Sequence, residues 1–269
     1  MSLNVFFPVR ASRLFIFALL TLLLAACAAN PDKEDDMSKW SAEKLFKEAK
    51  MALEAGDYEV AIETYETLEA KYPFGRYAEQ AQLDTAYAYF KFDEPDTAIT
   101  SADRFIKLHP RHRNVDYAYY LRGLASESKK QDPLDFIEKQ DPSLRDPSST
   151  LKSYEYYVEL VKKFPNSRYT ADALRRMGYL RNDLAMHEIH VARYYAERGA
   201  YVAVANRAKY VVSNFPRTPA SRLALQLLVE AYTQLKLDDL AADAQRVLDL
   251  NPAVTDQQST ANKKPAKAS

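Results

Sequence analysis

The chain of 269 residues is 47% apolar and 28% charged, which is ordinary for a globular protein and long enough to bury a sizeable core. Its formal net charge is zero, so the basic excess expected of a nucleic-acid-binding protein is absent. With only 5 glycines, the composition argues against folds rich in tight β-turns or phosphate-binding loops and favours helices joined by short turns.

The first 27 residues have the pattern of a bacterial lipoprotein signal. Arg10 and Arg13 precede an uncharged stretch, 14–26, which is long enough for a signal peptide but too short to cross a bilayer as a helix. It ends in Leu-Ala-Ala-Cys27, which resembles the lipobox at which a signal peptidase cuts and a cysteine is acylated. The alternative is an ordinary signal peptide, or a buried segment, with an incidental cysteine. Cys27 is the only cysteine, so no intrachain disulfide explains it. We predict that residues 1–26 are removed and that Cys27 carries a covalent diacylglycerol and an N-acyl chain.

The next segment, residues 27–40, is polar and rich in acids, which predicts a flexible tether. Several acyl chains on Cys27 would hold the protein at a membrane without a spanning helix. Lipoprotein sorting signals imply that an aspartate after the acylated cysteine retains a protein at the inner membrane. Because Ala28 stands there, the predicted location is the periplasmic face of the outer membrane.

Residues 42–73 fit the tetratricopeptide pattern of about 34 residues. The small, glycine, aromatic and proline positions of that pattern are filled by Ala49, Gly56, Tyr58, Ala61, Tyr65 and Pro73. Alanines let the two helices of a repeat cross closely, Gly56 ends the first helix, and Pro73 stops the second. This unit is therefore predicted to be a helix-turn-helix repeat.

The closing proline recurs four times, at Pro110, Pro165, Pro216 and Pro252. Two of the intervals are one repeat long, and two are longer by about half a repeat. One excess falls in the proline-containing stretch 129–147, which predicts an irregular loop. The other falls in residues 168–198, which contain no proline and predict one helix of about eight turns.

These observations predict an all-α fold, a tetratricopeptide-repeat superhelix of about five helix-turn-helix repeats. Repeats 1–3 are expected in residues 41–165 and repeats 4–5 in residues 166–252. The tail, residues 253–269, has no large apolar side chain after Val254, so we predict that it is disordered.

Longer stretches resemble one family of repeat proteins. They begin at Tyr72 (Tyr-Pro-Phe-Gly-Arg-Tyr-Ala-Glu-Gln-Ala), Asp103 (Asp-Arg-Phe-Ile-Lys-Leu-His-Pro), Phe164 (Phe-Pro-Asn-Ser-Arg-Tyr-Thr-Ala-Asp) and Tyr194 (Tyr-Tyr-Ala-Glu-Arg-Gly-Ala-Tyr-Val). Across essentially all of residues 27–252, the chain looks like the BamD family of outer-membrane assembly lipoproteins.

The resemblance implies a lipid-anchored scaffold subunit of the β-barrel assembly (BAM) complex. It implies docking on the periplasmic POTRA domains of the barrel protein BamA, attachment of other BAM lipoproteins, and recognition of the C-termini of unfolded outer-membrane proteins. The alternative is a pilotin-type tetratricopeptide lipoprotein that serves a secretin or a pilus.

An enzyme is a more distant alternative, because the chain contains no nucleophile motif, phosphate loop or cysteine cluster; we expect no catalytic residues, no metal and no cofactor beyond the lipid on Cys27. His187 and His190 lie three residues apart with Asp183 on the same helix face, a spacing that a metal site can use. A solvated, paired helix face explains the same spacing, and we prefer that interpretation.

A peptide-binding groove is expected along the first helix of each repeat, which lines the concave side of such superhelices. In the first two repeats, the expected inward positions are Glu43, Phe46, Lys50, Leu53, Gln80, Leu83, Tyr87, Phe90 and Lys91. The predicted groove residues among them are Phe46, Lys50, Tyr87, Phe90 and Lys91. Aromatic rings and two lysines suit an extended peptide that ends in an aromatic residue and a free carboxylate. If Phe46 and Phe90 are instead buried between repeats, these residues are structural.

A partner interface is predicted at the turn after the long helix. Glu197, Arg198 and Tyr201 surround Gly199 there, so charged and aromatic groups project from one corner. The family resemblance leads us to expect BamA at this corner. The alternative is that Arg198 only caps the C-terminus of its own helix.

Overall fold

The computed structural model describes residues 37–128, 141–144 and 146–252 of the chain. Within these ranges, the regular elements are helices: the short 3-10 helices η1 (Met37–Lys39) and η2 (Pro142–Leu144), and the α-helices α2 (Ala42–Ala55), α3 (Tyr58–Lys71), α4 (Arg76–Lys91), α5 (Pro95–Leu108), α6 (Val115–Ser128), α7 (Ser148–Lys163), α8 (Thr170–Ala196), α9 (Tyr201–Asn214), α10 (Pro219–Gln234) and α11 (Asp238–Leu250). The all-α prediction is confirmed.

The helix ends lie where local chemistry places them. Ser41 caps α2 by accepting a hydrogen bond from the backbone N–H of Lys44 at 3.2 Å. Gly56 ends the same helix with φ of 84°, a left-handed conformation that other residues adopt at a cost. Pro95 and Pro219 stand in the first turn of α5 and α10, where the missing N–H of proline is harmless.

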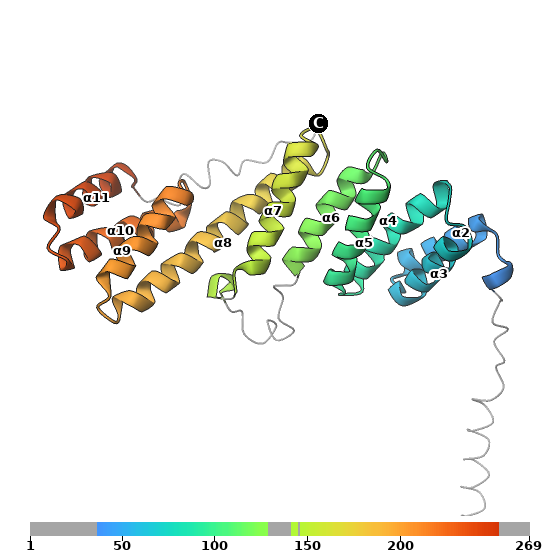
Figure 1. Ribbon diagram of the computed structural model, residues 1–269, viewed down its shortest axis with the longest axis horizontal. Helices are drawn as coiled ribbons and strands as arrows, with labels where there is room; N and C mark the ends of the chain where they lie inside the picture. The colour runs from blue at the N-terminus through green and yellow to red at the C-terminus, as the bar shows by residue number, and fades with distance from the viewer. Residues whose placement is uncertain (1–36, 129–140, 145, 253–269) are drawn as a thin grey trace, which may run out of the picture.

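The helices form five successive antiparallel pairs, α2–α3, α4–α5, α6–α7, α8–α9 and α10–α11, in one elongated row (Figure 1). We call the first helix of each pair the A helix and the second the B helix. A helices of successive pairs contact each other at α2–α4, α4–α6 and α8–α10, whereas B helices do not pack on one another in this way. The A helices are therefore on the inside of the curve, as expected of a tetratricopeptide superhelix.

The long helix α8 joins two hydrophobic cores. Its first half, with Ala173 and Leu180, packs into the core of α4 to α7, and its second half, with Ala185 and Ile189, packs into the core of α9 to α11. A third core lies among α2, α3 and α4. The 27 residues of α8 confirm the predicted helix of about eight turns, and its length lets one rigid element serve both halves.

Several predicted segments lie outside the described residues. These are the signal segment with Cys27, the tether up to residue 36, most of the loop 129–147, and the tail from residue 253. No helix of the described ranges has the length and hydropathy needed to span a bilayer.

Candidate functional site: the inner strip and the C-terminal corner

One side of α4 lines the inner face of the N-terminal repeats. Tyr77, Gln80, Asp84 and Tyr87 recur at intervals of three or four residues, so their side chains project in similar directions from the helix. All four are half-buried. Phe46 of α2 packs at one end of this stripe, with its ring centroid 5.4 Å from that of Tyr77.

Lys50 of α2 is paired with Asp84 across the A helices. Its Nζ lies 3.9 Å from Asp84 Oδ2, and Asp84 also accepts hydrogen bonds from Gln80 at 2.8 Å and from the hydroxyl of Tyr65 at 3.3 Å. Burial raises the pKa of the Asp84 carboxyl, although these hydrogen bonds and the Lys50 charge oppose the shift. A peptide carboxylate that approaches Lys50 must therefore compete with a carboxylate already there.

Aromatic rings continue the stripe from α4 to α8. The ring centroid of Tyr87 lies 6.4 Å from that of Tyr117 in α6, and the Tyr117 centroid lies 5.3 Å from that of Tyr169, next to the start of α8. Tyr120 stacks on Tyr169 at 4.9 Å with an interplanar angle of 15°. Burial raises the pKa of Tyr117, Tyr120 and Tyr169, so their hydroxyls stay neutral and can donate hydrogen bonds.

We call this set the inner strip: Phe46, Lys50, Tyr77, Asp84, Tyr87, Tyr117, Tyr120 and Tyr169. Its members come from three A helices, α2, α4 and α6, and from Tyr169, the residue that precedes α8. The strip offers half-buried rings with hydroxyl groups and one ion pair, which is the chemistry of an extended-peptide groove.

The structure brings together only part of the predicted groove. Tyr87 and Phe90 share a ring contact at 6.5 Å, and Phe46 and Lys50 stand on the same helix. Lys91 lies apart, because its ammonium group is over the ring of Tyr58 at 5.9 Å, beside α3. Of the other inward positions, Leu53 and Leu83 are core residues, and Glu43 is exposed.

Sequence reasoning missed five members of the inner strip: Tyr77, Asp84, Tyr117, Tyr120 and Tyr169. Helical spacing carried the signal for Tyr77 and Asp84, which fall three residues before Gln80 and four after it. No such signal existed for Tyr169, which lies in a turn and joins the strip only because α8 follows α7 closely.

The second predicted site, at the end of α8, forms an exposed corner. The Arg198 guanidinium lies 3.5 Å from the ring centroid of Tyr194 and donates to the Tyr194 carbonyl at 3.0 Å. The Glu197 carboxylate oxygen Oε2 lies 3.8 Å from Arg198 Nη1, and Gly199 turns the chain with φ of 69°. Arg198 is thus both a cap of its own helix and an exposed cation, with 52% of its side chain accessible.

Apolar groups surround this corner. Tyr194 and Val202 are exposed by 52% and 62%, whereas Tyr201 packs against the C-terminal core. Beyond them, α8 and α9 border a hollow of about 420 Å³ lined by Tyr195, Ala203, Asn206, Arg207 and Tyr210. The corner therefore combines a cation, exposed rings and a concavity, which are features of a protein-binding surface.

The two histidines of α8 hold η2 in place. His187 Nδ1 lies 3.0 Å from the Ser143 carbonyl, and His190 Nε2 lies 2.9 Å from the Ser143 hydroxyl and 3.4 Å from Asp141. Their role is neither the metal site nor the solvated helix face considered from the sequence, because both rings contact the segment before α7. In the described ranges, no cluster of three or more histidine, cysteine or acidic side chains is arranged to hold a metal ion.

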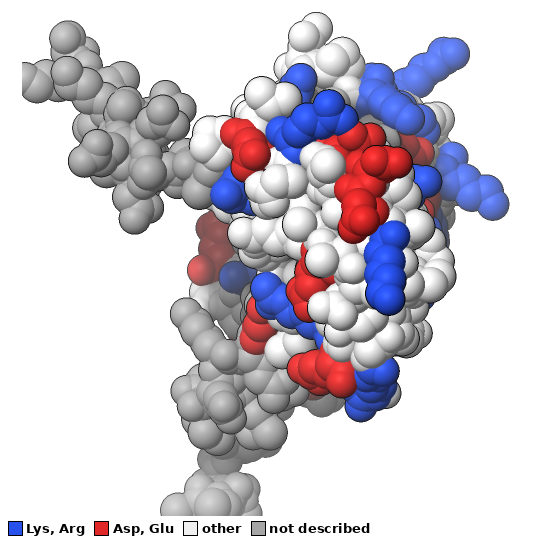
Figure 2. Space-filling model, turned by 90° about the vertical axis from the view of Figure 1, so that its left-hand side faces the viewer, with Lys and Arg blue, Asp and Glu red and all other residues white. Residues whose placement is uncertain are grey.

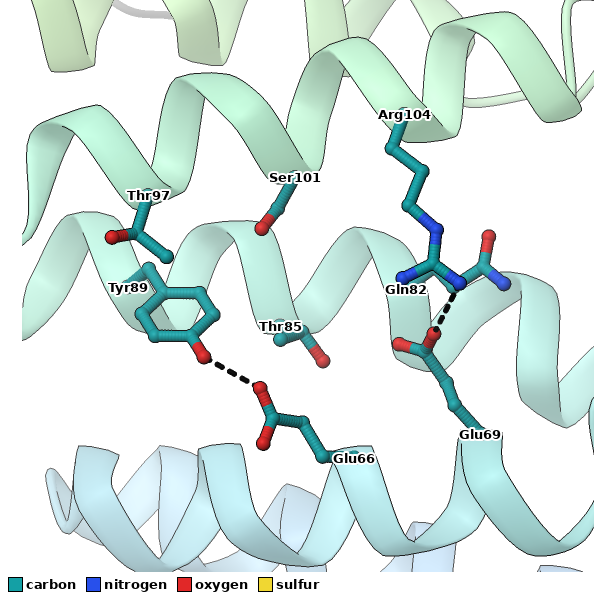
Figure 3. Close-up of a pocket in the computed structure, with 8 residues that line it drawn as sticks. All are labelled: Glu66, Glu69, Gln82, Thr85, Tyr89, Thr97, Ser101 and Arg104. Atoms are coloured by element: carbon teal, nitrogen blue, oxygen red, sulfur yellow. Dashed lines mark hydrogen bonds and ion pairs between the residues drawn. The ribbon is translucent and has the colours of Figure 1, made fainter.

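A small polar pocket of about 120 Å³ lies on the side of α4 that faces α3 and α5 (Figure 3). Tyr89 donates a 2.5 Å hydrogen bond to Glu66, and Arg104 lies 3.8 Å from Glu69. Burial, together with the bond to Glu66, raises the pKa of Tyr89 to about 12. Since each carboxylate already has a partner, the pocket joins the helices rather than presenting a free charge.

A family model described as an outer membrane lipoprotein (YfiO) matches residues 38–248, which is most of the chain. The chain belongs to this family. The outer membrane protein assembly factor BamD of Neisseria gonorrhoeae is 46% identical over 235 residues, which cover 86% of this chain and 88% of that protein. BamD of Vibrio cholerae is 36% identical over 230 residues, which cover 86% and 94%.

These family members confirm the resemblance found in the sequence. A solved structure of the MamA protein aligns with 85% of this chain and 98% of its own, at 16% identity and a TM-score of 0.37, a similarity too low to bear on the fold or on function.

Proposed function

We propose that this protein is an outer-membrane protein assembly factor, a scaffold subunit of the BAM complex that binds other proteins and catalyses no reaction. The observation that carries the proposal is family membership across residues 38–248, which include both the inner strip and the C-terminal corner. The names of the family members do not favour a pilotin. Co-purification from detergent-solubilised membranes tests the proposal: BamA should be recovered, and recovery of a secretin without BamA would contradict it.

We propose that acylation of Cys27 holds the protein on the periplasmic face of the outer membrane. The lipobox-like end of the signal segment supports this, and three acyl chains would suffice without a spanning helix. Replacing Cys27 by Ser behind an ordinary cleavable signal should give a soluble periplasmic protein with its helical fold intact. Retention of this variant in the membrane pellet, after a high-salt wash and removal of partners, would contradict the anchor.

We propose that BamA docks at the C-terminal corner through a POTRA domain. The exposed Arg198, with Tyr194 beneath it, supports this placement. Arg198→Glu puts a negative charge at the contact and should weaken BamA binding by about 2 kcal/mol or more if the arginine becomes buried there. Arg198→Gln is the control, because it loses the helix cap without reversing the charge. Equal BamA binding by the Glu variant and the parent would place the interface elsewhere.

We propose that the inner strip binds the aromatic C-termini of unfolded outer-membrane proteins weakly. A carboxylate held by a partly exposed lysine gains only about 1 kcal/mol, and here Asp84 competes for Lys50. The rings must then supply most of the affinity, which should be micromolar or weaker. Amidation of the peptide C-terminus should weaken binding slightly, and replacement of its terminal Phe by Ala should weaken it more.

Three variants separate this groove from a structural role. Tyr87→Ala and Lys50→Ala should lower peptide affinity, whereas Lys91→Ala, which changes a lysine that lies over Tyr58, shows whether the second lysine takes part. Each variant is titrated with peptide and melted in parallel. Lower melting temperatures with unchanged affinity in Tyr87→Ala and Lys50→Ala would leave these residues as structural.

A further inference from the structure

The turns that lead from each B helix to the next A helix form one edge of the molecule, and each of the four carries an exposed arginine. These are Arg76 at the start of α4, Arg113 before α6, Arg168 before α8 and Arg217 before α10. We call this edge the BA edge. In Figure 1 its turns run along the upper side, and in the end-on view of Figure 2 Lys and Arg project from the upper side.

The helix dipole does not explain these arginines. The N-terminus of an α-helix carries partial positive charge, which favours acidic rather than basic groups. Across the described ranges, none of the four arginines forms an ion pair; Arg76 faces the ring of Tyr77 and donates to its hydroxyl at 3.1 Å, and Arg168 faces the ring of Tyr169. Four unpaired cations in repeated, unfavourable positions therefore point to a ligand outside the chain.

Two hollows flank the turn before α6. One, of about 510 Å³, lies against Arg111, and the other, of about 390 Å³, reaches Lys163 and Asn166. His112 and Arg113 line both. Glu79 and Asp116 are the acids that border the hollows, one in each, so basic groups outnumber acids around them. Each hollow is large enough for a phosphate-bearing headgroup.

Apolar side chains share the BA edge. Phe74, in the turn before α4, is 90% exposed, and Leu108, at the end of α5, is 52% exposed. The Trp40 carbonyl accepts hydrogen bonds from Lys71 at 2.8 Å and from the Tyr72 hydroxyl at 3.0 Å, which places the start of the described chain at the same edge. Exposed rings among cations are typical of proteins that rest on a lipid surface.

The opposite edge has a net negative charge among the described residues. Its turns, which join an A helix to its B helix, carry Asp57, Asp93, Glu94 and Glu197, and Asp238 and Asp239 begin α11, against the two basic residues Arg198 and Lys236. An anionic surface would therefore attract the BA edge and repel the other, which gives the elongated molecule a preferred orientation.

We propose that the BA edge docks on anionic phospholipid headgroups of the membrane to which the protein is anchored. This rests on the proposed acylation of Cys27: the ten-residue step from Cys27 to Met37 spans at most about 35 Å, so the first repeat stays near the bilayer. The arginines bind headgroup phosphates, and Phe74 enters the interface. Docking along this edge leaves the C-terminal corner, which belongs to the opposite edge, facing away from the membrane.

The test uses the chain from residue 27 with Cys27→Ser, which contains every described residue and carries no lipid. It is sedimented with vesicles of phosphatidylcholine alone or with about 30% phosphatidylglycerol, at low and high salt. We expect binding only to the anionic vesicles and at low salt. Arg111→Glu with Arg113→Glu should lower the lipid partition coefficient at least about tenfold, and Phe74→Ser about threefold.

The matched control is Lys209→Glu with Lys236→Glu, which makes the same change in net charge on α9 and at the turn before α11. It should bind within about twofold of the parent. No binding of the parent to anionic vesicles, or an equal loss in the control, overturns the proposal and leaves an acidic partner protein as the alternative occupant. If the unacylated chain does not bind the vesicles but the acylated protein is still recovered in the membrane fraction, edge docking alone is refuted and the proposed lipid anchor is unaffected.

Discussion

The close packing of α6 against α7 at Gly123 predicts the effect of a single methyl group. A Cβ added at Gly123 of α6 would lie 2.2 Å from the Tyr157 ring carbon Cε1 and 2.6 Å from two other ring atoms. Tyr157 of α7 is fully buried, its hydroxyl donates to Glu127 at 3.0 Å, and Ser153 donates to the Gly123 carbonyl at 2.8 Å. The ring therefore has no free direction in which to move.

Gly123→Ala should destabilise the protein despite the better helix propensity of alanine. Overpacking of this kind costs about 1–3 kcal/mol, and the propensity gain returns up to about 1 kcal/mol. Because the added methyl meets the body of a ring rather than the end of a flexible chain, we place the overpacking cost near ~3 kcal/mol, which leaves a net loss of about 2 kcal/mol. For a chain of this size, that lowers the melting temperature by about 4–8 °C.

Gly178→Ala is the matched control, since Gly178 lies in α8 with nothing within 4 Å of its added Cβ. Only the propensity term acts there, so the free energy of unfolding should rise by about 0.5–1 kcal/mol. Thermal and urea melts followed by far-ultraviolet circular dichroism measure both variants. An increase in stability for Gly123→Ala equal to that of Gly178→Ala would refute the argument that Tyr157 blocks this position.

Three further perturbations follow from buried or coupled charges. Arg122 is buried among α5, α6 and α7 with Asp103 and Glu159 each at 2.7 Å, but both carboxylates are partly exposed, so Arg122→Ala leaves them solvated; the loss of its hydrogen bonds and packing should lower the free energy of unfolding by about 1.5–3 kcal/mol in urea melts, and an unchanged value would contradict this. Burial raises the pKa of Asp84 above 3.8, so the folded protein loses stability as pH rises from the unfolded-state pKa to the folded-state pKa of this carboxyl. The melting temperature of Asp84→Asn should therefore rise relative to that of the parent from about pH 4 to 7. A difference in melting temperature that does not change with pH would argue against this. His190→Ala should speed amide exchange at Ser143 while α8 stays protected; unchanged exchange would show that η2 needs no histidine.

The candidate site was only partly predictable from the sequence. Phe46, Lys50 and Tyr87 were found because their spacing places them on the inner side of an A helix, and spacing is a local property. The stacking of neighbouring helix pairs decides that Lys50 pairs with Asp84 and that Lys91 lies over Tyr58. Which side chains meet across two repeats depends on the rotation and register of one helix pair relative to the next, and the sequence pattern of a single repeat does not specify these.

The sequence by itself determined the repeat count, the helix ends and the length of α8. Caps such as Gly56, and the proline after each B helix, act within a few residues, so the same local rule recurs in every unit. Only the tertiary structure decided the contacts that join distant segments. His187 meets Ser143 across 44 residues, and the BA edge gathers arginines from four separate turns. Such contacts depend on the summed geometry of packed helix pairs, in which a small rotation at each crossing decides which distant side chains meet.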